Sequence, residues 1–323
     1  MKHLRRIAAI AALAFSTLAA GQTWPSRPIT IMAAAPAGGT TDVLARALAD
    51  VMGKALGQPM VVDNRPGASG MLAVQQLARA PADGYTVLVT VSTPIYYAPY
   101  TNSKLGYDVR RDLAMLTHLC DASLVLAVHK DVPARTLPEF LAWAGQQQGK
   151  LSYGSYGTGS SGHLVSAYLA RKHQLDMVHV PYKGETPLLQ DLVGGQVQWT
   201  LATVGSMLPH IQSGRLRALA VFGDQRLPDL PEVPTIAELG YHEPEVRIIG
   251  GLVMVAPAGT PAPILARLEQ EVRAAVQSTA LKARFQAYGL IPVGNSAAQM
   301  RQSLDTYGRV IDRLVQAAGV RLD

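Results

Sequence analysis

Short apolar runs alternate with amphipathic segments along almost the whole chain, and this alternation limits the fold more than any other feature. Residues 41–56 place their apolar side chains on one stripe at helical spacing and end at Gly57, which predicts a helix. Apolar runs at 29–32, 59–63 and 85–91 predict strands before and after it. Strands alternating with helices predict an α/β fold, a mostly parallel sheet with helices on both faces.

The alternation begins again after residue 124. Strands are expected there with helices between them, at 124–128, 151–155, 177–180, 196–202 and 216–221. After a proline-rich connection, a strand at 248–256 and three helices within 263–318 close the chain. Two α/β units with helices left over at the end indicate that one domain is inserted in the other. We therefore expect domain 1 to comprise 22–122 and 249–323, and domain 2 to comprise 123–248.

The first residues have the pattern of a secretory signal. Lys2, Arg5 and Arg6 precede an uncharged run over 7–20, which is too short for a membrane span and ends in small residues. We expect a signal peptide at 1–21 with cleavage near Gly21. Gln22 stands where a lipoprotein would have cysteine, so no lipid anchor is expected.

Loss of this segment would lower the formal charge from +6 to +3, because three basic residues and no acidic residue leave with it. The remaining charge is mild and contains no basic block, so nucleic acid is not expected as a partner. Cys120 is the only cysteine and cannot form an internal disulfide, so we interpret it as a buried apolar residue.

Two strand ends run into loops of glycine and hydroxyl residues that precede a helix, at 33–42 and 151–163. The first amides of a helix lack partners and carry the positive end of the helix dipole, so such loops can bind an anion without a metal. The alternative is an ordinary capped turn at each helix start. Ligands of α/β sheets bind beyond the carboxyl ends of strands, which makes residues 92–97 a third candidate region.

Catalytic and cofactor motifs are weak. Residues 157–162 satisfy G-x-G-x-x-G, but the acidic residue that a dinucleotide site needs after the next strand is missing. Ser161 and His163 lie two residues apart, but no G-x-S-x-G elbow occurs, which leaves an exported serine esterase as a minor alternative. The histidines show no metal-binding spacing, so no metal and no cofactor are expected.

A series of segments in a consistent order resembles one family, the TctC or Bug substrate-binding receptors of tripartite tricarboxylate transporters. The segments span nearly all of the expected mature chain and include Trp24-Pro25-Ser26-Arg27-Pro28-Ile29, Pro36-Ala37-Gly38-Gly39-Thr40-Thr41-Asp42, Asn64-Arg65-Pro66-Gly67, Ala82-Asp83-Gly84-Tyr85-Thr86, Gly159-Ser160-Ser161-Gly162-His163, His179-Val180-Pro181-Tyr182-Lys183-Gly184, Leu208-Pro209-His210-Ile211, Pro231-Glu232-Val233-Pro234-Thr235 and Ala256-Pro257-Ala258-Gly259-Thr260-Pro261.

This resemblance implies a two-domain periplasmic binding protein of the type II kind, with the ligand cleft between the domains and no enzymatic activity. It implies a monomeric periplasmic receptor for a small carboxylate, which passes the ligand to the permease subunits of a tripartite tricarboxylate transporter or, alternatively, to a sensor kinase. The ligand-binding residues implied by the two loops, the third region and the strand end near 201 are Ala37, Gly38, Gly39, Thr40, Asp42, Ser92, Thr93, Ser155, Tyr156, Thr158, Gly159, Ser160, Ser161, His163 and Thr203.

Departures from the family pattern bear on the ligand. Ala35 and Ala37 stand where the first loop commonly carries an aromatic residue and a proline. Ala202 and Thr203 stand where an acidic residue and an asparagine are frequent, and the missing acid argues mildly against an amino-acid ligand. Tyr156 replaces a frequent small residue and could form an aromatic wall, although all of these differences could also be ordinary drift.

Overall fold

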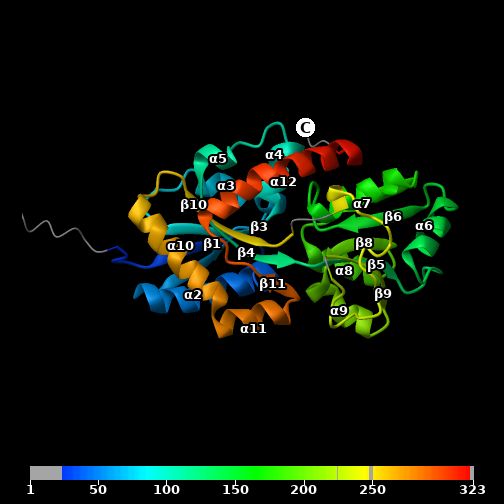
Figure 1. Ribbon diagram of the computed structural model, residues 1–323, viewed down its shortest axis with the longest axis horizontal. Helices are drawn as coiled ribbons and strands as arrows, with labels where there is room; N and C mark the ends of the chain where they lie inside the picture. Colours follow the sequence, from blue (N-terminus) through cyan, green and yellow to red (C-terminus); the bar gives the residue numbers. More distant parts are fainter. Residues whose placement is uncertain (1–23, 224, 247–249, 321–323) are drawn as a thin grey trace, which may run out of the picture.

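Two β-sheets with helices on their faces form the framework of the computed structural model, which describes residues 24–223, 225–246 and 250–320 (Figure 1). The first, sheet A, has the strand order β11-β4-β10-β3-β1-β2. Its strands are β1 (Ile29–Ala33), β2 (Met60–Asn64), β3 (Thr86–Val91), β4 (Leu113–Ala122), β10 (Leu252–Pro257) and β11 (Leu290–Pro292). β1 pairs in parallel with β2 and β3, whereas β10 and β11 pair antiparallel with their neighbours.

Sheet B has the order β7-β6-β8-β5-β9. Its strands are β5 (Leu124–His129), β6 (Leu151–Ser155), β7 (Met177–Pro181), β8 (Trp199–Thr203) and β9 (Leu216–Phe222). β6 pairs in parallel with β7 and β8, and β5 pairs antiparallel with β8 and β9. The α/β fold class is confirmed, but both sheets are mixed, because the strands β4, β5 and β10 that flank the crossings run antiparallel to their neighbours.

The helices follow the expected pattern of apolar stripes. They are α2 (Thr40–Leu56), α3 (Met71–Leu77), α4 (Ala98–Thr101), α5 (Val109–Asp112), α6 (Leu137–Gly145), α7 (Ser161–Lys172), α8 (Glu185–Val193), α9 (Val204–Gln212), α10 (Ala262–Gln277), α11 (Thr279–Ala287) and α12 (Ala297–Ala318), with short helical turns η2 (Ala68–Gly70), η3 (Thr93–Tyr97) and η4 (Pro244–Val246). One buried cluster packs α2, α10 and α11 against sheet A, with Leu44, Leu48 and Phe285 fully buried in it.

A second apolar cluster joins the two sheets. It contains Leu88 of β3 and Trp199 of β8 together with Leu164 of α7 and Ile311 of α12. In Figure 1, α12 runs along the upper edge of the molecule from the side of sheet A toward α7. The C-terminal helix therefore belongs to domain 1 by sequence but packs on a helix of the second unit.

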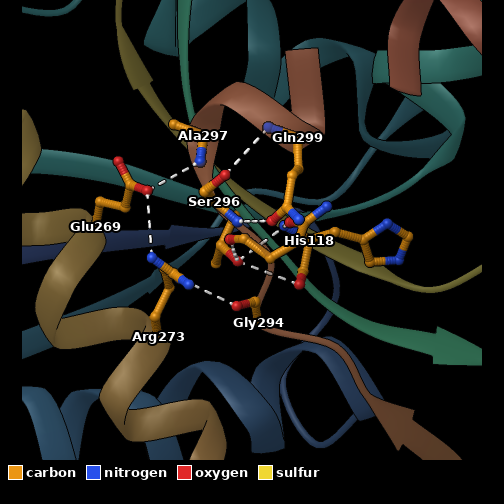
Figure 2. A network of polar contacts seen from close by, with 9 residues as sticks. His118, Glu269, Arg273, Gly294, Ser296, Ala297 and Gln299 are labelled. Carbon is orange, nitrogen blue, oxygen red and sulfur yellow. Dashed lines mark hydrogen bonds and ion pairs between the residues drawn. The ribbon is translucent and has the colours of Figure 1, made fainter. Parts of the chain in front are cut away.

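A polar network holds the first turn of α12 to sheet A and α10 (Figure 2). The Ala297 amide donates to Glu269 Oε1 at 3.0 Å, and Ser296 and Gln299 form a reciprocal capping box. On the other side, the His118 amide of β4 donates to Asn295 Oδ1 at 2.8 Å. These contacts fix the start of the helix that spans the two units.

Between the two sheets, the chain crosses at Ser123, which separates β4 from β5, and again between β9 and β10. Gly251 lies at the start of β10 with a φ of +126°, and a side chain there would collide with the Cys120 carbonyl oxygen. From the sequence we predict a hinge where the chain crosses between the units, near 120–124 and 241–249, and residues 247–249 lie outside the described residues. The predicted domain limits stay a prediction.

Candidate functional site

The carboxyl ends of parallel strands in both sheets carry the candidate residues. β1 and β3 lie side by side in sheet A and lead into residues 34–39 and into Ser92, whereas β6 and β8 lie side by side in sheet B and end at Ser155 and Thr203. Ligands of α/β sheets bind beyond this end of the strands. The topology therefore brings the two glycine loops to the corresponding edges of the two sheets.

The start of α2 exposes helix amides that have no partner. Gly39 is the N-cap residue with extended backbone, and no side chain caps the helix. Among the described residues, the amides of Thr40, Thr41 and Asp42 have no hydrogen-bond acceptor, whereas the Val43 amide donates to the Gly39 carbonyl oxygen at 3.0 Å. Three unpaired amides at the positive end of a 17-residue helix are the kind of donors that anions bind, and the binding of an anion here stays a prediction.

Asp42 shapes the loop in front of this helix. Its Oδ2 accepts hydrogen bonds from the Gly38 amide at 2.9 Å and from Arg46 Nε at 3.1 Å, and its Oδ1 accepts from Asn64 Nδ2 at 2.9 Å. Burial opposes ionisation, but these donors outweigh it and hold the pKa of the carboxyl below its usual range. The Asp42 carboxylate is thus engaged with the protein, and its direct contact with a ligand stays a prediction.

The second loop satisfies most of its own amides. Ser160 is the N-cap residue of α7, and its Oγ accepts from the His163 amide at 3.2 Å. The Gly159 amide donates to His163 Nδ1 at 3.0 Å. Among the described residues, the amides of Thr158 and Ser161 have no acceptor. The start of α7 can therefore offer fewer amides to a ligand than the start of α2.

Tyr156 ties Ser161 into this loop. Its hydroxyl lies 2.6 Å from Ser161 Oγ and accepts from the Gly162 amide at 3.0 Å. Burial raises the pKa of Tyr156 to about 12, so the hydroxyl stays protonated at neutral pH. Ser161 Oγ is buried and pairs with this phenol instead of an imidazole, which is not the geometry of an activated nucleophile.

A stack of aromatic rings packs against the glycine loop that precedes α7. The rings of Tyr153 and His179 have centroids 5.1 Å apart, and His179 in turn stacks on His163. His179 Nε2 lies 2.8 Å from Ser155 Oγ, which is fully buried and also donates to the Gly157 carbonyl oxygen. Burial lowers the pKa of His163 to about 3 and that of His179 to about 4, so both rings are neutral near pH 7.

A contact between the two units occurs at this edge. A side chain on Gly157 would collide with the hydroxyl of Ser69, which belongs to the turn η2 beside sheet A. Ser69 has a φ of +52°, and a side chain on its neighbour Gly70 would lie 2.7 Å from Thr90 Oγ1. The segment Asn64-Arg65-Pro66-Gly67 of the family resemblance ends two residues before Ser69, but Ser69 was not among the candidate residues.

Thr203 is bound to an acidic residue that sequence reasoning also missed. Its amide donates to Glu185 Oε1 at 2.9 Å and its Oγ1 donates to Glu185 Oε2 at 2.6 Å. Glu185 is the first residue of α8 and is half-buried. The only signal in the sequence was an acid at the start of an expected helix. Such acids are common, because they interact favourably with the positive end of the helix dipole, so this one did not indicate a site.

The remaining predicted residues differ in exposure. Ser92 and Thr93 are 3% exposed, and the Ser92 amide donates to the Gly251 carbonyl oxygen at 3.0 Å. Ala37 and Gly38 are exposed at the tip of the first loop, and Thr40 is half-buried.

Two cavities of the described structure, of about 430 and 270 Å³, lie elsewhere. The larger lies beside β9 and the start of α6, and the smaller lies between η3 and α12. The larger is lined by no predicted site residue, whereas the smaller is lined by Ile95 and Tyr96 of the third candidate region but by none of the individually named ligand-binding residues. In the described part of the chain, no three His, Cys, Asp or Glu side chains are grouped so that they could hold a metal. No described helix is both long and apolar enough to cross a membrane.

Two mixed α/β sheets flanked by helices, with glycine loops at the starts of α2 and α7, have the architecture of a periplasmic binding protein. The model of the tripartite tricarboxylate transporter family receptor matches residues 44–320. The chain belongs to this family, the TctC or Bug receptors, which bind solutes and are not enzymes.

Individual relatives support this assignment over nearly the full length. The chain is 34% identical to BugT of Bordetella pertussis over 96% of its own length and 93% of the relative's. It is similar to a solved R. palustris protein with adipate, at 31% identity and a TM-score of 0.85, covering 92% and 99% of the two chains. It is also similar to MatC from Rhodopseudomonas palustris with bound malate, at 29% identity and a TM-score of 0.82, covering 90% and 100%.

Proposed function

We propose that this receptor binds a small carboxylate between its two units, with the carboxylate held at the start of α2 and contacted from the other side by the loop before α7. The observation that carries the proposal is the uncapped start of α2, where the Thr40, Thr41 and Asp42 amides lack acceptors within the described residues. An anion at a helix start is stabilised by these donors and by the helix dipole together. The binding of adipate and malate by the two R. palustris relatives supports this ligand class.

The proposal assigns different roles to the candidate residues. Residues with donors or exposed backbone at the loops would contact the ligand, namely Gly38, Gly39, Thr40, Thr158 and Ser161. Others would hold the loops in place through the contacts described above, namely Asp42, Ser155, Tyr156, Gly159, Ser160, His163 and Thr203. Ala37, Ser92 and Thr93 would line the edges of the site, and Ser69 joins them from the structure.

Delivery to the permease of a tripartite tricarboxylate transporter is the physiological role that we propose. The family match supports it, and the signal-like segment at 1–21, which lies outside the described residues, supports export to the periplasm. Delivery to a sensor kinase is the alternative. Capture of the exported protein by one or the other membrane partner distinguishes them.

A thermal-shift screen tests the ligand class. The purified mature protein is heated with butyrate, succinate, malate and adipate, and with the corresponding neutral amides as matched controls. A ligand at about a hundredfold over its dissociation constant stabilises the folded state by ~2.7 kcal/mol, which gives a clear rise in melting temperature. A rise with carboxylates and none with amides is expected. Equal shifts with acids and amides, or none with any acid, contradict the proposal.

A further inference from the structure

The carboxylate of Glu185 lies at the edge of sheet B where the ligand is proposed to bind. Thr203 ends β8, and its amide and hydroxyl both donate to Glu185, at 2.9 and 2.6 Å. β8 pairs with β6, whose end begins the glycine loop. The acid is therefore placed beside the loop by the start of α8.

The position of Tyr156 supports this placement. A side chain on Gly162 would collide with the Tyr156 ring and with the Leu201 carbonyl oxygen, so the ring lies close to both the first turn of α7 and the end of β8. Burial raises the pKa of Tyr156, and the negative charge of Glu185 raises it further, as expected for a carboxylate close to the phenol. Tyr156 thus lies near Glu185 and contacts Ser161, within the loop where the ligand is proposed to bind.

The carboxylate of Glu185 keeps acceptor capacity. An ionised carboxylate has about four lone-pair positions, and Thr203 uses one on each oxygen. Within the described residues Glu185 forms no ion pair. A half-buried carboxylate without a cation favours a hydrogen-bond donor or a positive charge next to it and disfavours a second anion.

We propose that Glu185 is a specificity-determining residue that selects carboxylates bearing a hydrogen-bond donor, an ammonium or a hydroxyl group, and rejects ligands that place a second carboxylate beside it. This inference rests on the proposed carboxylate site at the start of α2. It reverses the expectation drawn from Ala202 and Thr203, because the acid missing from the end of β8 is supplied by α8.

Isothermal titration with compounds of four carbons tests the inference. Butyrate, succinate, 4-hydroxybutyrate, 4-aminobutyrate and 2-aminobutyrate share a four-carbon chain with one carboxylate and differ in the second polar group or in its position. Wild type should bind at least one hydroxy or amino compound about tenfold more tightly than butyrate and succinate, since a hydrogen bond to a charged group has this strength. An advantage of the amino compounds alone assigns the selected group to ammonium, and an advantage of the hydroxy compound assigns it to hydroxyl.

Glu185→Gln separates selection from a purely structural role. The amide oxygen can still accept from Thr203, but the charge is lost, so the preference for an amino compound over butyrate should fall about tenfold. If the selected group is a hydroxyl, Glu185→Gln should instead raise the affinity for succinate relative to that for butyrate, because the repulsion between the two carboxylates is lost. Glu139→Gln is the matched control, because Glu139 is also a first-turn acid of its helix, at the start of α6 beside the larger cavity, and it should leave both ratios unchanged.

Two outcomes overturn the inference alone. One is wild type that binds butyrate or succinate as tightly as the substituted compounds, and the other is Glu185→Gln that weakens every ligand by one common factor. Failure of wild type to bind any of the five compounds overturns the inference, and it contradicts the proposed function as well only if no acid of the thermal screen binds. The failure of selectivity and the failure of carboxylate binding are therefore distinguishable.

Discussion

The rings of His163 and His179 lie face to face, with centroids 3.7 Å apart and planes 8° apart. Two imidazolium ions could not occupy this arrangement, and His163 Nδ1 must stay unprotonated to accept from the Gly159 amide. The stack therefore makes the glycine loop dependent on neutral histidines.

Acidification should destabilise the protein through this pair. The pKa of His163 falls from its ordinary value of 6.5 to about 3, so between these values the unfolded chain binds a proton that the folded protein does not. The contribution of His163 to the free energy of unfolding is therefore fully present above pH 6.5 and is lost as the pH is lowered. At pH 5 this imidazole alone should lower the free energy of unfolding by about 2 kcal/mol. Melting temperatures measured from pH 7.5 to 4.5 should show the decline.

The variant His163→Asn is the control for this pH dependence. The asparagine Oδ1 can replace Nδ1 as the acceptor for the Gly159 amide, but it does not titrate. The variant should have a lower melting temperature at pH 7.5, because the ring stack is lost, and a flatter decline with pH. An unchanged slope would show that other groups cause the decline.

Ser160 and Ser161 should respond differently to alanine. Ser160 Oγ caps α7, so Ser160→Ala should lower the stability by about 1 kcal/mol. Ser161→Ala should instead weaken carboxylate binding by roughly 1.5 to 3 kcal/mol, if its hydroxyl donates to the ligand. Chemical denaturation and calorimetry on the same two variants give both quantities. Equal loss of stability with no loss of affinity in Ser161→Ala would remove Ser161 from the site.

Gly205 lies where the two units come into close contact. It lies in the first turn of α9, and a side chain there would collide with the Tyr288 carbonyl oxygen near the end of α11. Alanine favours the helix itself, so Gly205→Ala should separate the units without unfolding α9. Overpacking of this kind costs about 1 to 3 kcal/mol, which should appear as weaker ligand binding.

Small-angle scattering of Gly205→Ala tests this separation. The radius of gyration of the unliganded variant should exceed that of wild type, and ligand should reduce the difference, since closure about crossing segments accompanies binding in such architectures. Gly145→Ala is the control, because Gly145 is the exposed last residue of α6, has no positive φ, and would bring an added Cβ no closer than 3.8 Å to its nearest neighbour, Leu175 Cδ2. An identical radius and affinity in Gly205→Ala would show that this contact does not limit closure.

The amphipathic segments were predictable from the sequence, because a helix that covers a sheet repeats its apolar residues at a spacing that is visible within the segment itself. The helix α2 begins one residue before its expected start and ends at its expected limit, and the three helices α10, α11 and α12 together cover the expected range 263–318 to within one residue. β4 was missed, because most of this strand is buried and its residues Thr117, His118 and Cys120 break the apolar run without alternation. β11 was too short to give a pattern.

The two glycine loops were also predictable, since glycines and hydroxyls between a strand and a helix leave few other structures. Their differences were not. Only the structure shows that Asp42 is engaged with Arg46 and Asn64, and that Ser160 caps its own helix. Ser69 and Glu185 reach the site through contacts between segments far apart in the sequence, and no local pattern reports such contacts.

The start of α2 is tested most directly by calorimetry on Gly39→Asp. Gly39 has a φ of −75° that any residue can adopt, and the atom nearest to an added Cβ is the Pro36 carbonyl oxygen at 3.4 Å. An aspartate at this N-cap can place its own carboxylate on the amides that the ligand is proposed to use, at no loss of helix stability. Gly39→Ala adds the Cβ without the charge.

Isothermal titration of wild type, Gly39→Ala and Gly39→Asp with the strongest carboxylate of the thermal screen is therefore the decisive measurement. We expect Gly39→Asp to keep the melting temperature of wild type and to lose at least about a hundredfold in affinity, as the internal carboxylate competes for the site and repels the ligand. Gly39→Ala should bind within about tenfold of wild type. A stable Gly39→Asp that binds as tightly as wild type would contradict a carboxylate site at the start of α2.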